Sequence, residues 1–190
     1  VSYPEIVRFA GGQVVPLLTS PSRDFLFEAD ALEALIGPRT KWLLLNSPGN
    51  PTGACYPPEM LRSIGAVLRR HPQVMVLSDD IYAPLIYNGR AHAMLATECP
   101  DLAPQILTVS GVSKSHAMTG FRIGVAAGPE WLIRLMETLQ SHSSGNPSSI
   151  SQAAAVAAFE GPQSFLADWR ERFRQRRDQA GEHWSQEPGK

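Results

Sequence analysis

The stretch Ser110–Arg122, SGVSKSHAMTGFR, contains a single lysine, Lys114, and ends on Arg122. An apolar run over 106–109 precedes it and a second run over 123–127 follows it. Both runs have the length and composition of buried strands, which predicts a tight loop between two strands. The link is too short for a helical crossover, so 123–127 should return antiparallel to 106–109 and bring Arg122 back beside Lys114.

These two cations have chemistry that suits a bound cofactor. The amine of Lys114 attacks a carbonyl when the site keeps part of it uncharged. The planar guanidinium of Arg122 suits a phosphate. The alternative is that both are solvated loop charges, so the other loops must decide.

Composition sets the broad class of the protein. The chain has 190 residues, with 43% hydrophobic and 18% charged residues and a net charge of -1, which is typical of a globular domain with a sizeable core. Neither a nucleic-acid partner nor a membrane partner is expected, because there is no basic excess, no spanning run and no signal peptide. Cys55 and Cys99 lack metal-like spacing, which favours thiols in a reducing, cytoplasmic compartment and no metal site.

Further segments predict alternating strands and helices. Strands are expected at 13–18, 41–46 (KWLLLN) and 73–78 (QVMVLS), in addition to 106–109 and 123–127. Helices are expected at 2–10, 31–36, 57–70, 130–140 and 150–159, and from 162 onward, with a long surface loop at 83–104 that includes a turn of helix. The pattern predicts an α/β fold with a mostly parallel, doubly wound sheet and one antiparallel strand.

Ligands bind such sheets beyond the carboxyl ends of the strands. Asn50, Asp79, Tyr82 and Lys114 all follow predicted strands. With Arg122, they suit a phosphorylated, nitrogen-heterocyclic aldehyde. Four strand ends with complementary groups are hard to obtain by chance.

Each residue has an expected role toward such a group. Lys114 forms the Schiff base and later acts as general base, while Asp79 keeps the ring nitrogen protonated. Tyr82 and Asn50 hydrogen-bond the phenolic oxygen. Arg122 holds the phosphate together with the Ser113 hydroxyl. The expected catalytic residues are Lys114, Asp79 and Tyr82.

Structural alternatives stay open at this point. Asp79 is a candidate cap for the following turn, and Asp80 is a candidate for the ring-nitrogen partner in its place. Tyr82 fits a half-buried loop position, and Asn50 before Pro51 fits an ordinary turn. Arg122 is a candidate for pairing with a surface carboxylate.

The motifs NSPGNPTG (46–53), SDDIY (78–82) and SGVSKSHAMTGFRIG (110–124) resemble those of the class I and II aminotransferases, the fold-type I pyridoxal-phosphate enzymes of the aspartate aminotransferase superfamily. SSGNPSSISQAAAVAAF (143–159) is similar to the family's segment near the dimer interface. The resemblance covers residues 1 to 177. It implies pyridoxal 5'-phosphate as cofactor, the same residue roles, amino-acid and 2-oxo-acid substrates, and a homodimer. The family often has serine three positions before the lysine, where this chain has Gly111.

The resemblance also implies that parts of the family's chain are absent. The glycine- and serine-rich phosphate loop and the stacking aromatic residue should precede Val1, and the small domain with the carboxylate-binding arginine should follow. We therefore expect 1–177 to be the central part of the large cofactor-binding domain. The segment 178–190 is expected to be an atypical polar tail, of truncated or frame-shifted origin.

Three functions are compatible with these residues. The first is an amino-acid aminotransferase whose isolated chain is weakly active at best. The second is another fold-type I enzyme that forms or eliminates carbon–carbon bonds. The third is non-catalytic, either a dead fragment or an effector domain, although no basic DNA-binding module accompanies it.

Overall fold

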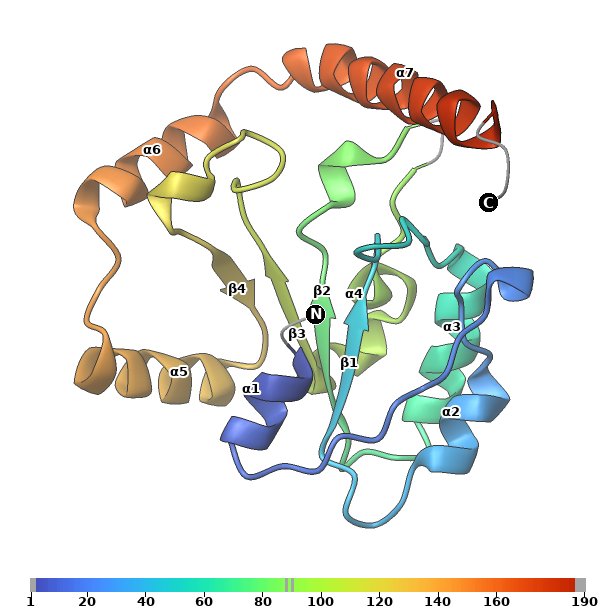
Figure 1. The fold of residues 1–190 in the computed structure, drawn as a ribbon. Helices are drawn as coiled ribbons and strands as arrows, with labels where there is room; N and C mark the ends of the chain where they lie inside the picture. Colours follow the sequence, from blue (N-terminus) through green and yellow to red (C-terminus); the bar gives the residue numbers. More distant parts are fainter. Residues whose placement is uncertain (1–2, 88, 90, 187–190) are drawn as a thin grey trace.

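A four-stranded sheet in the order β1-β2-β3-β4 forms the centre of this computed structural model, which describes residues 3–87, 89 and 91–186 (Figure 1). The strands are β1 (Trp42–Asn46), β2 (Met75–Asp79), β3 (Ile106–Ser110) and β4 (Val125–Ala127). β1, β2 and β3 are parallel to one another. β4 runs antiparallel to β3, with Thr108 opposite Ala127 and Ser110 opposite Val125. The predicted antiparallel return is therefore confirmed.

The helices follow the predicted order. The α-helices are α1 (Tyr3–Phe9), α2 (Ala29–Leu35), α3 (Pro58–Leu68), α4 (Leu95–Glu98), α5 (Glu130–Ser143), α6 (Ser149–Glu160) and α7 (Phe165–Gln186). Short 3₁₀ turns are η1 (Pro21–Arg23), η2 (Ala83–Leu85), η3 (Pro100–Gln105) and η4 (Thr119–Phe121). The segment 83–104, expected as a loop with a turn of helix, contains η2, α4 and most of η3. Helix α7 runs on into the polar segment that begins at residue 178, and residues 187–190 lie outside the described residues.

The strand predicted at 13–18 is wrong. This segment crosses the molecule as irregular chain, and the side chains of Val15 and Leu18 are exposed. Pro16 lacks the N–H that a strand interior donates, and the segment pairs with no strand of the described sheet. Leu17 of this segment is partly buried and packs against the core.

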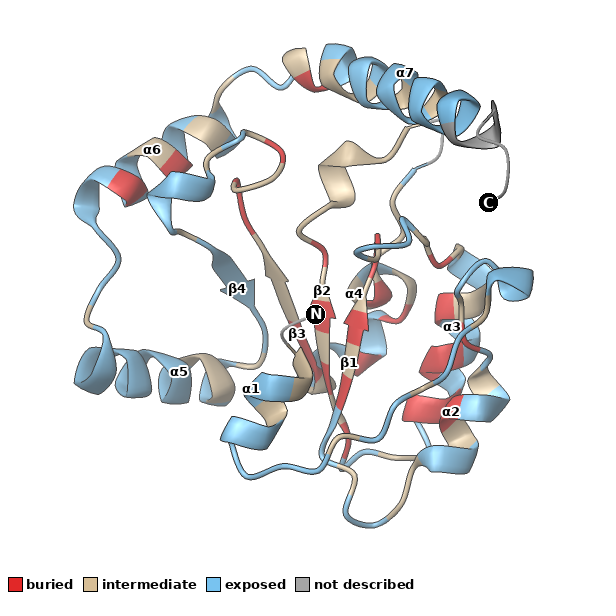
Figure 2. Cartoon of the chain, in the orientation of Figure 1, coloured by how far each residue is buried: buried red, intermediate tan, exposed pale blue. Residues whose placement is uncertain are grey.

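The core lies on one face of the sheet. Successive residues of β2 point to opposite faces of the sheet. Val76 and Ser78 lie on the covered face and are buried, whereas Leu77 and Asp79 lie on the other face and are half-buried. Val76 belongs to the same buried cluster as Ile64 of α3. Figure 2 shows buried residues on the strands and on the neighbouring helix α3. The buried hydrophobic cluster comprises Phe27, Leu32, Leu43, Leu45, Tyr56, Leu61, Ile64, Val67, Leu68, Val74, Val76, Leu95, Cys99, Leu102 and Ile106.

The β4 side of the sheet is open. All three residues of β4 are exposed, and α5 buries no residue (Figure 2). The apolar side chains of α5 that were expected at helical spacing, among them Trp131, Leu135 and Leu139, are on the surface. Exposed apolar groups in such number are typical of a surface that another polypeptide covers.

Close packing between α3 and Cys99 makes Gly65 sensitive to substitution. A Cβ added at Gly65 lies 2.3 Å from the Sγ of Cys99, which is fully buried. The higher helix propensity of alanine stabilises the fold by up to about 1 kcal/mol. Overpacking against Cys99 destabilises it by about 1–3 kcal/mol or more. We expect Gly65→Ala to lower the free energy of unfolding in urea by about 2 kcal/mol.

Two controls test this cause. Gly37→Ala places its Cβ in open space and should change the free energy of unfolding by less than about 0.5 kcal/mol. Cys99→Ala removes the clashing sulfur, so Gly65→Ala should cost clearly less in that background. An equal cost in both backgrounds would contradict the packing explanation.

Candidate functional site

Asp79 ends β2 at the carboxyl edge of the sheet, and its carboxylate is held from two directions. Its Oδ1 accepts a hydrogen bond of 3.1 Å from the backbone N–H of Ile81, and its Oδ2 accepts one from the hydroxyl of Tyr3. Burial, together with the hydrogen bond to Asp79, raises the pKa of Tyr3 well above its usual value. Tyr3 therefore keeps its proton at neutral pH and remains a donor to this carboxylate.

The loop after β1 joins the same edge. Asn46 donates from its side chain to the carbonyl of Asp79 at 3.0 Å and accepts from the N–H of Asn50 at 3.0 Å. The side chain of Asn50 then donates to the hydroxyl of Tyr82 at 3.2 Å. The peptide bonds before Pro48 and Pro51 are both cis. Asn50, Tyr82 and Asp79, predicted to share one edge, are thus connected through Asn46 and the turn after β2.

Lys114 lies in the tight turn after β3. The turn is closed by a 3.0 Å hydrogen bond from the N–H of His116 to the carbonyl of Val112, and Ala117 has a positive φ of 51°. The Nζ of the half-buried Lys114 is 5.7 Å from the centre of the Tyr82 ring. This is within the range of a cation–π contact. The lysine therefore lies close to Tyr82, in the turn that follows β2.

Arg122 enters β4 from this edge. The strand pair is antiparallel, so the segment that leads into β4 runs beside the segment that leaves β3 towards Lys114. The exposed guanidinium of Arg122 donates to the carbonyl of Thr119 at 2.9 Å, and its φ is 51°. Among the described ion pairs, none joins Arg122 to a carboxylate, which leaves the surface-pair alternative without support.

Ser113 is half-buried in the lysine turn. Gly111, two residues earlier, is packed against the opposite strand segment. A Cβ at Gly111 lies 3.3 Å from the Cα of Gly124 and 3.3 Å from the carbonyl oxygen of Ile123. A serine here would therefore need the neighbouring backbone to shift slightly. The roles of Ser113 and Arg122 toward a phosphate stay predictions.

Two structural alternatives receive an answer. Asp79 does accept from the N–H of Ile81, so it caps the turn while its other oxygen faces Tyr3. The carboxylate of Asp80 is buried and bonded to Ser78 and His92. The Asp80 carboxylate therefore points into the protein interior, whereas Asp79 is half-buried at the sheet edge.

Tyr3 and Asn46 belong to the site and were missed as site residues. Asn46 stands at the start of the NSPGNPTG motif, at the end of a predicted strand, so its position was a usable signal. Tyr3 is 76 positions from Asp79 in the chain. The local sequence pattern of α1, a helix of seven residues, does not predict such a distant contact.

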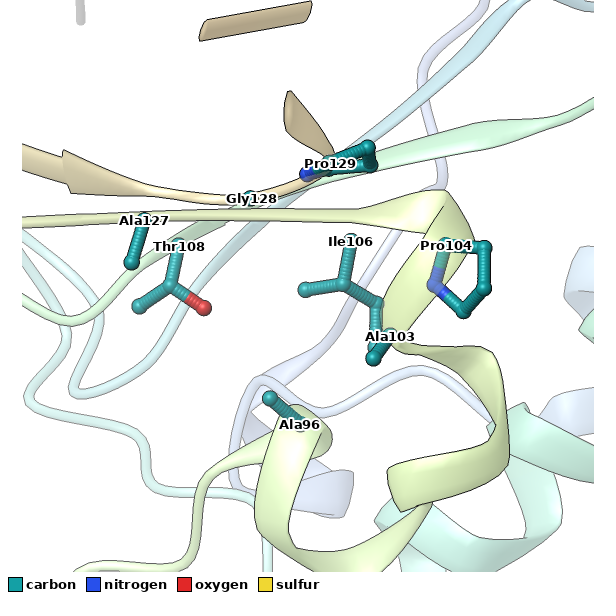
Figure 3. Close-up of a pocket in the computed structure, with 8 residues that line it drawn as sticks. All are labelled: Ala96, Ala103, Pro104, Ile106, Thr108, Ala127, Gly128 and Pro129. Atoms are coloured by element: carbon teal, nitrogen blue, oxygen red, sulfur yellow. The ribbon is translucent and has the colours of Figure 1, made fainter. Parts of the chain in front are cut away.

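A separate cavity of about 500 Å³ lies at the other end of β3 (Figure 3). Its lining comes from the segments around Ile106 at the start of β3, from Ala96 of α4, and from Gly128 and Pro129 after β4. Thr108 supplies the polar side chain in an otherwise apolar wall. The cavity has no charged group for a phosphate, so the site at the carboxyl edge remains the candidate. Over the described part of the chain, no cluster of His, Cys, Asp and Glu suited to a metal ion was found.

Comparisons with known proteins find relatives along most of the chain. The family model described as aminotransferase class I and II matches residues 1–186. The chain is 49% identical over 178 residues to the aspartate/prephenate aminotransferase of Cereibacter sphaeroides, which covers 94% of this chain and 44% of that protein. It is 46% identical over 176 residues to the aspartate aminotransferase of Geobacillus stearothermophilus, covering 93% and 44%.

Solved structures give the same result for the fold. The aspartate aminotransferase from Rhizobium meliloti superposes with a TM-score of 0.91 at 48% identity, covering 93% of this chain and 44% of that one. The aromatic aminotransferase from Pyrococcus horikoshii gives a TM-score of 0.88 at 33% identity, covering 94% and 48%. The mostly parallel sheet with one antiparallel strand is therefore that of fold-type I aminotransferases. The chain spans less than half the length of these relatives.

Proposed function

Since this chain belongs to the class I and II aminotransferases, we propose that residues 1–177 form the central part of the cofactor domain of an enzyme that moves an amino group from an amino acid to a 2-oxo acid. The family depends on pyridoxal 5'-phosphate. Aspartate is the proposed donor, because the relatives are named aspartate and aspartate/prephenate aminotransferases. Residues 178–190 are proposed to be a polar tail outside this domain. The observation that carries the proposal is that the Lys114 Nζ lies 5.7 Å from the centre of the Tyr82 ring, in the turn that follows Asp79 at the end of β2.

The residues present suit this cofactor. A lysine amine suits its aldehyde, and the Asp79 carboxylate suits its ring nitrogen. The side chains of Tyr82 and Asn50 already bond each other at 3.2 Å and offer donors for the phenolic oxygen. Arg122 and Ser113 provide the guanidinium and hydroxyl for the phosphate.

The cofactor supplies an aldehyde that accepts the amino group and a positive ring that withdraws electrons from the substrate's α-carbon. Asp79 maintains that positive charge, and Tyr3 fixes the orientation of the Asp79 carboxylate. Lys114 holds the cofactor between reactions. As a free amine, the Lys114 Nζ would take a proton from the substrate α-carbon as general base.

A half-reaction tests the proposal. The chain is loaded with pyridoxal 5'-phosphate and mixed with L-aspartate, and the carbon products are identified by chromatography. We expect oxaloacetate, formed slowly and at most in amounts equal to the enzyme. A decarboxylated or eliminated product would show a different fold-type I reaction. Bound cofactor without any product would show a catalytically dead fragment.

Tyr3→Phe isolates the contribution of one hydroxyl. It removes the donor to Asp79 while keeping the aromatic ring. We expect the dissociation constant for pyridoxal 5'-phosphate to rise about threefold to tenfold, which is the usual net value of one hydrogen bond. A titration followed by visible absorbance measures it.

Tyr56→Phe is the matched control for this substitution. The Tyr56 hydroxyl accepts from the N–H of Phe27 at 3.2 Å in the core, and burial raises the pKa of Tyr56 to about 12. This variant should lose stability, by about 1 kcal/mol, without any change in cofactor affinity. Equal affinities for Tyr3→Phe and the unmodified chain would remove Tyr3 from the site.

We also propose that the protein is a homodimer. The support is the number of exposed apolar side chains on α5 and α6, which include Leu139, Ile150 and Phe159. Light scattering after size exclusion should give twice the mass of one chain. Leu139→Glu, on the exposed face of α5, should shift the chain towards monomer, and a monomeric unmodified chain would contradict the proposal.

The proposed location is the cytoplasm. The thiol of Cys55 donates to the carbonyl of Gly53 at 3.4 Å, and that of Cys99 to the carbonyl of Leu61 at 3.8 Å. Thiols of this kind suit a reducing compartment. Within the described helices, no segment combines the length and the apolar character that crossing a bilayer requires.

A further inference from the structure

A second carboxylate, that of Asp80, is buried directly beside the candidate cofactor site. Asp80 is only 3% exposed. Its Oδ1 lies 2.7 Å from the Nε2 of His92, and its Oδ2 accepts a hydrogen bond of 3.0 Å from the hydroxyl of Ser78. A buried carboxylate is stable only when its oxygens are paired or hydrogen-bonded. His92, whose side chain is 12% exposed, meets this condition together with Ser78.

The main chain of Asp80 connects the parts of the site. Its N–H donates to the carbonyl of Val109 at 2.9 Å, on the strand that leads to Lys114. Its carbonyl accepts from the N–H of Ala83 at 2.9 Å, which closes the turn that carries Tyr82. Asp79 is the preceding residue. Any shift of Asp80 therefore moves the residues that surround the proposed cofactor.

The turn is held from both faces of the sheet. Successive residues of an extended chain point to opposite faces. Tyr3 of α1 holds the Asp79 carboxylate from one face. His92, in the segment that leads into α4, holds the Asp80 carboxylate from the other. The contacts of Tyr3 with Asp79 and of His92 with Asp80 together fix the orientation of the backbone that carries the Asp79 carboxylate.

We propose that His92, acting through Asp80, is a positioning residue that aims the Asp79 carboxylate at the cofactor ring nitrogen. The inference rests on the proposed function, because it takes Asp79 as the ring-nitrogen partner. Without His92, Ser78 is the remaining side-chain partner of the Asp80 carboxylate among the described residues, and the buried oxygen that loses its partner favours a movement of the side chain towards solvent. This movement disturbs the backbone that carries Asp79.

His92→Ala in the full chain is the direct test. We expect the dissociation constant for pyridoxal 5'-phosphate to rise about tenfold. We also expect the pH midpoint of the visible band of the bound cofactor to rise, because a misplaced Asp79 no longer maintains the positive ring that favours proton loss nearby. His92→Gln keeps an N–H donor at a similar reach, so it should restore most of both values.

A double-mutant cycle tests the path through Asp80. In an Asp80→Ala background, His92→Ala should add little to either value, because the partner is already absent. His71→Ala is the matched control, because the His71 Nε2 lies 2.8 Å from Glu33 at the opposite end of β2. That variant should leave the affinity and the pH midpoint unchanged. Circular dichroism confirms which variants are folded, and the comparison of His92→Ala with His92→Gln stands if Asp80→Ala does not fold.

The outcomes separate the two proposals. An unmodified chain without a visible band or a covalently trapped cofactor overturns the proposed function and this inference with it. A normal band in the unmodified chain, with His92→Ala within about twofold in affinity and unshifted in pH midpoint, overturns the inference alone. A loss of thermal stability without a change in the band also overturns it, because His92 would then be only structural.

Discussion

Lys114→Ala is expected to abolish covalent capture of pyridoxal 5'-phosphate. The unmodified chain should develop a visible absorbance band on addition of the cofactor, and borohydride should trap it on the Lys114 Nζ. The variant should show neither, because no other amine lies in the turn after β3. The remaining affinity should be that of the phosphate and ring contacts alone, at least about 100-fold weaker.

The small number of lysines makes this result easy to assign. The sequence contains lysine only at positions 41, 114 and 190. Peptide mass spectrometry after borohydride therefore distinguishes site-directed trapping from random labelling, and the exposed Lys41 reports the random background. Lys41→Arg should leave the band intact. A band of equal strength in Lys114→Ala would remove Lys114 from its role.

Asp79→Asn is expected to slow the half-reaction with aspartate by about 100-fold or more, by analogy with the loss of one preorganised electrostatic contact. Asparagine keeps the shape of the side chain and an oxygen that accepts from Ile81. It removes the negative charge that maintains the protonated ring nitrogen. The cofactor should therefore still be captured by Lys114 while proton removal from the substrate α-carbon becomes slow.

Single-turnover formation of oxaloacetate measures this effect. Asp101→Asn provides the control, because Asp101 is an exposed carboxylate whose ion pair with Arg69, at 2.7 Å, lies beside α3. The Asp101 side chain is well exposed, so Asp101→Asn should change the free energy of unfolding only modestly. Rates for Asp79→Asn within about twofold of the unmodified chain would show that another group is the ring-nitrogen partner.

Much of the sheet could be predicted because local patterns are sufficient for it. Apolar runs such as 41–46 and 106–109 must be buried, and a link as short as 110–122 has no room for a crossover helix. The strand at 13–18 failed because apolar residues in an extended segment satisfy the same pattern without a sheet partner. Pro16 and the exposure of Leu18 show that tertiary context decided the outcome there.

The site residues that directly follow the parallel strands were predicted from the sequence. Asn50, Tyr82 and Lys114 follow directly from the order of strands, because the carboxyl ends of parallel strands meet at one edge. Tyr3 and His92 were not predicted as site residues. Their contacts join segments that are distant in the chain or lie in irregular structure, where no periodicity constrains a side chain.

The amino-acid sequence by itself determined the parallel strands, the antiparallel return and the identity of the groups at the sheet edge, because hydrophobic period, link length and strand order are local properties of the chain. Only the tertiary structure decided which carboxylate is available. Asp79 and Asp80 are neighbours with the same chemistry, yet the pleat turns one towards Tyr3 and the other into the interior against Ser78 and His92. That choice depends on which face of the sheet the core covers, and this is settled by packing of the whole chain.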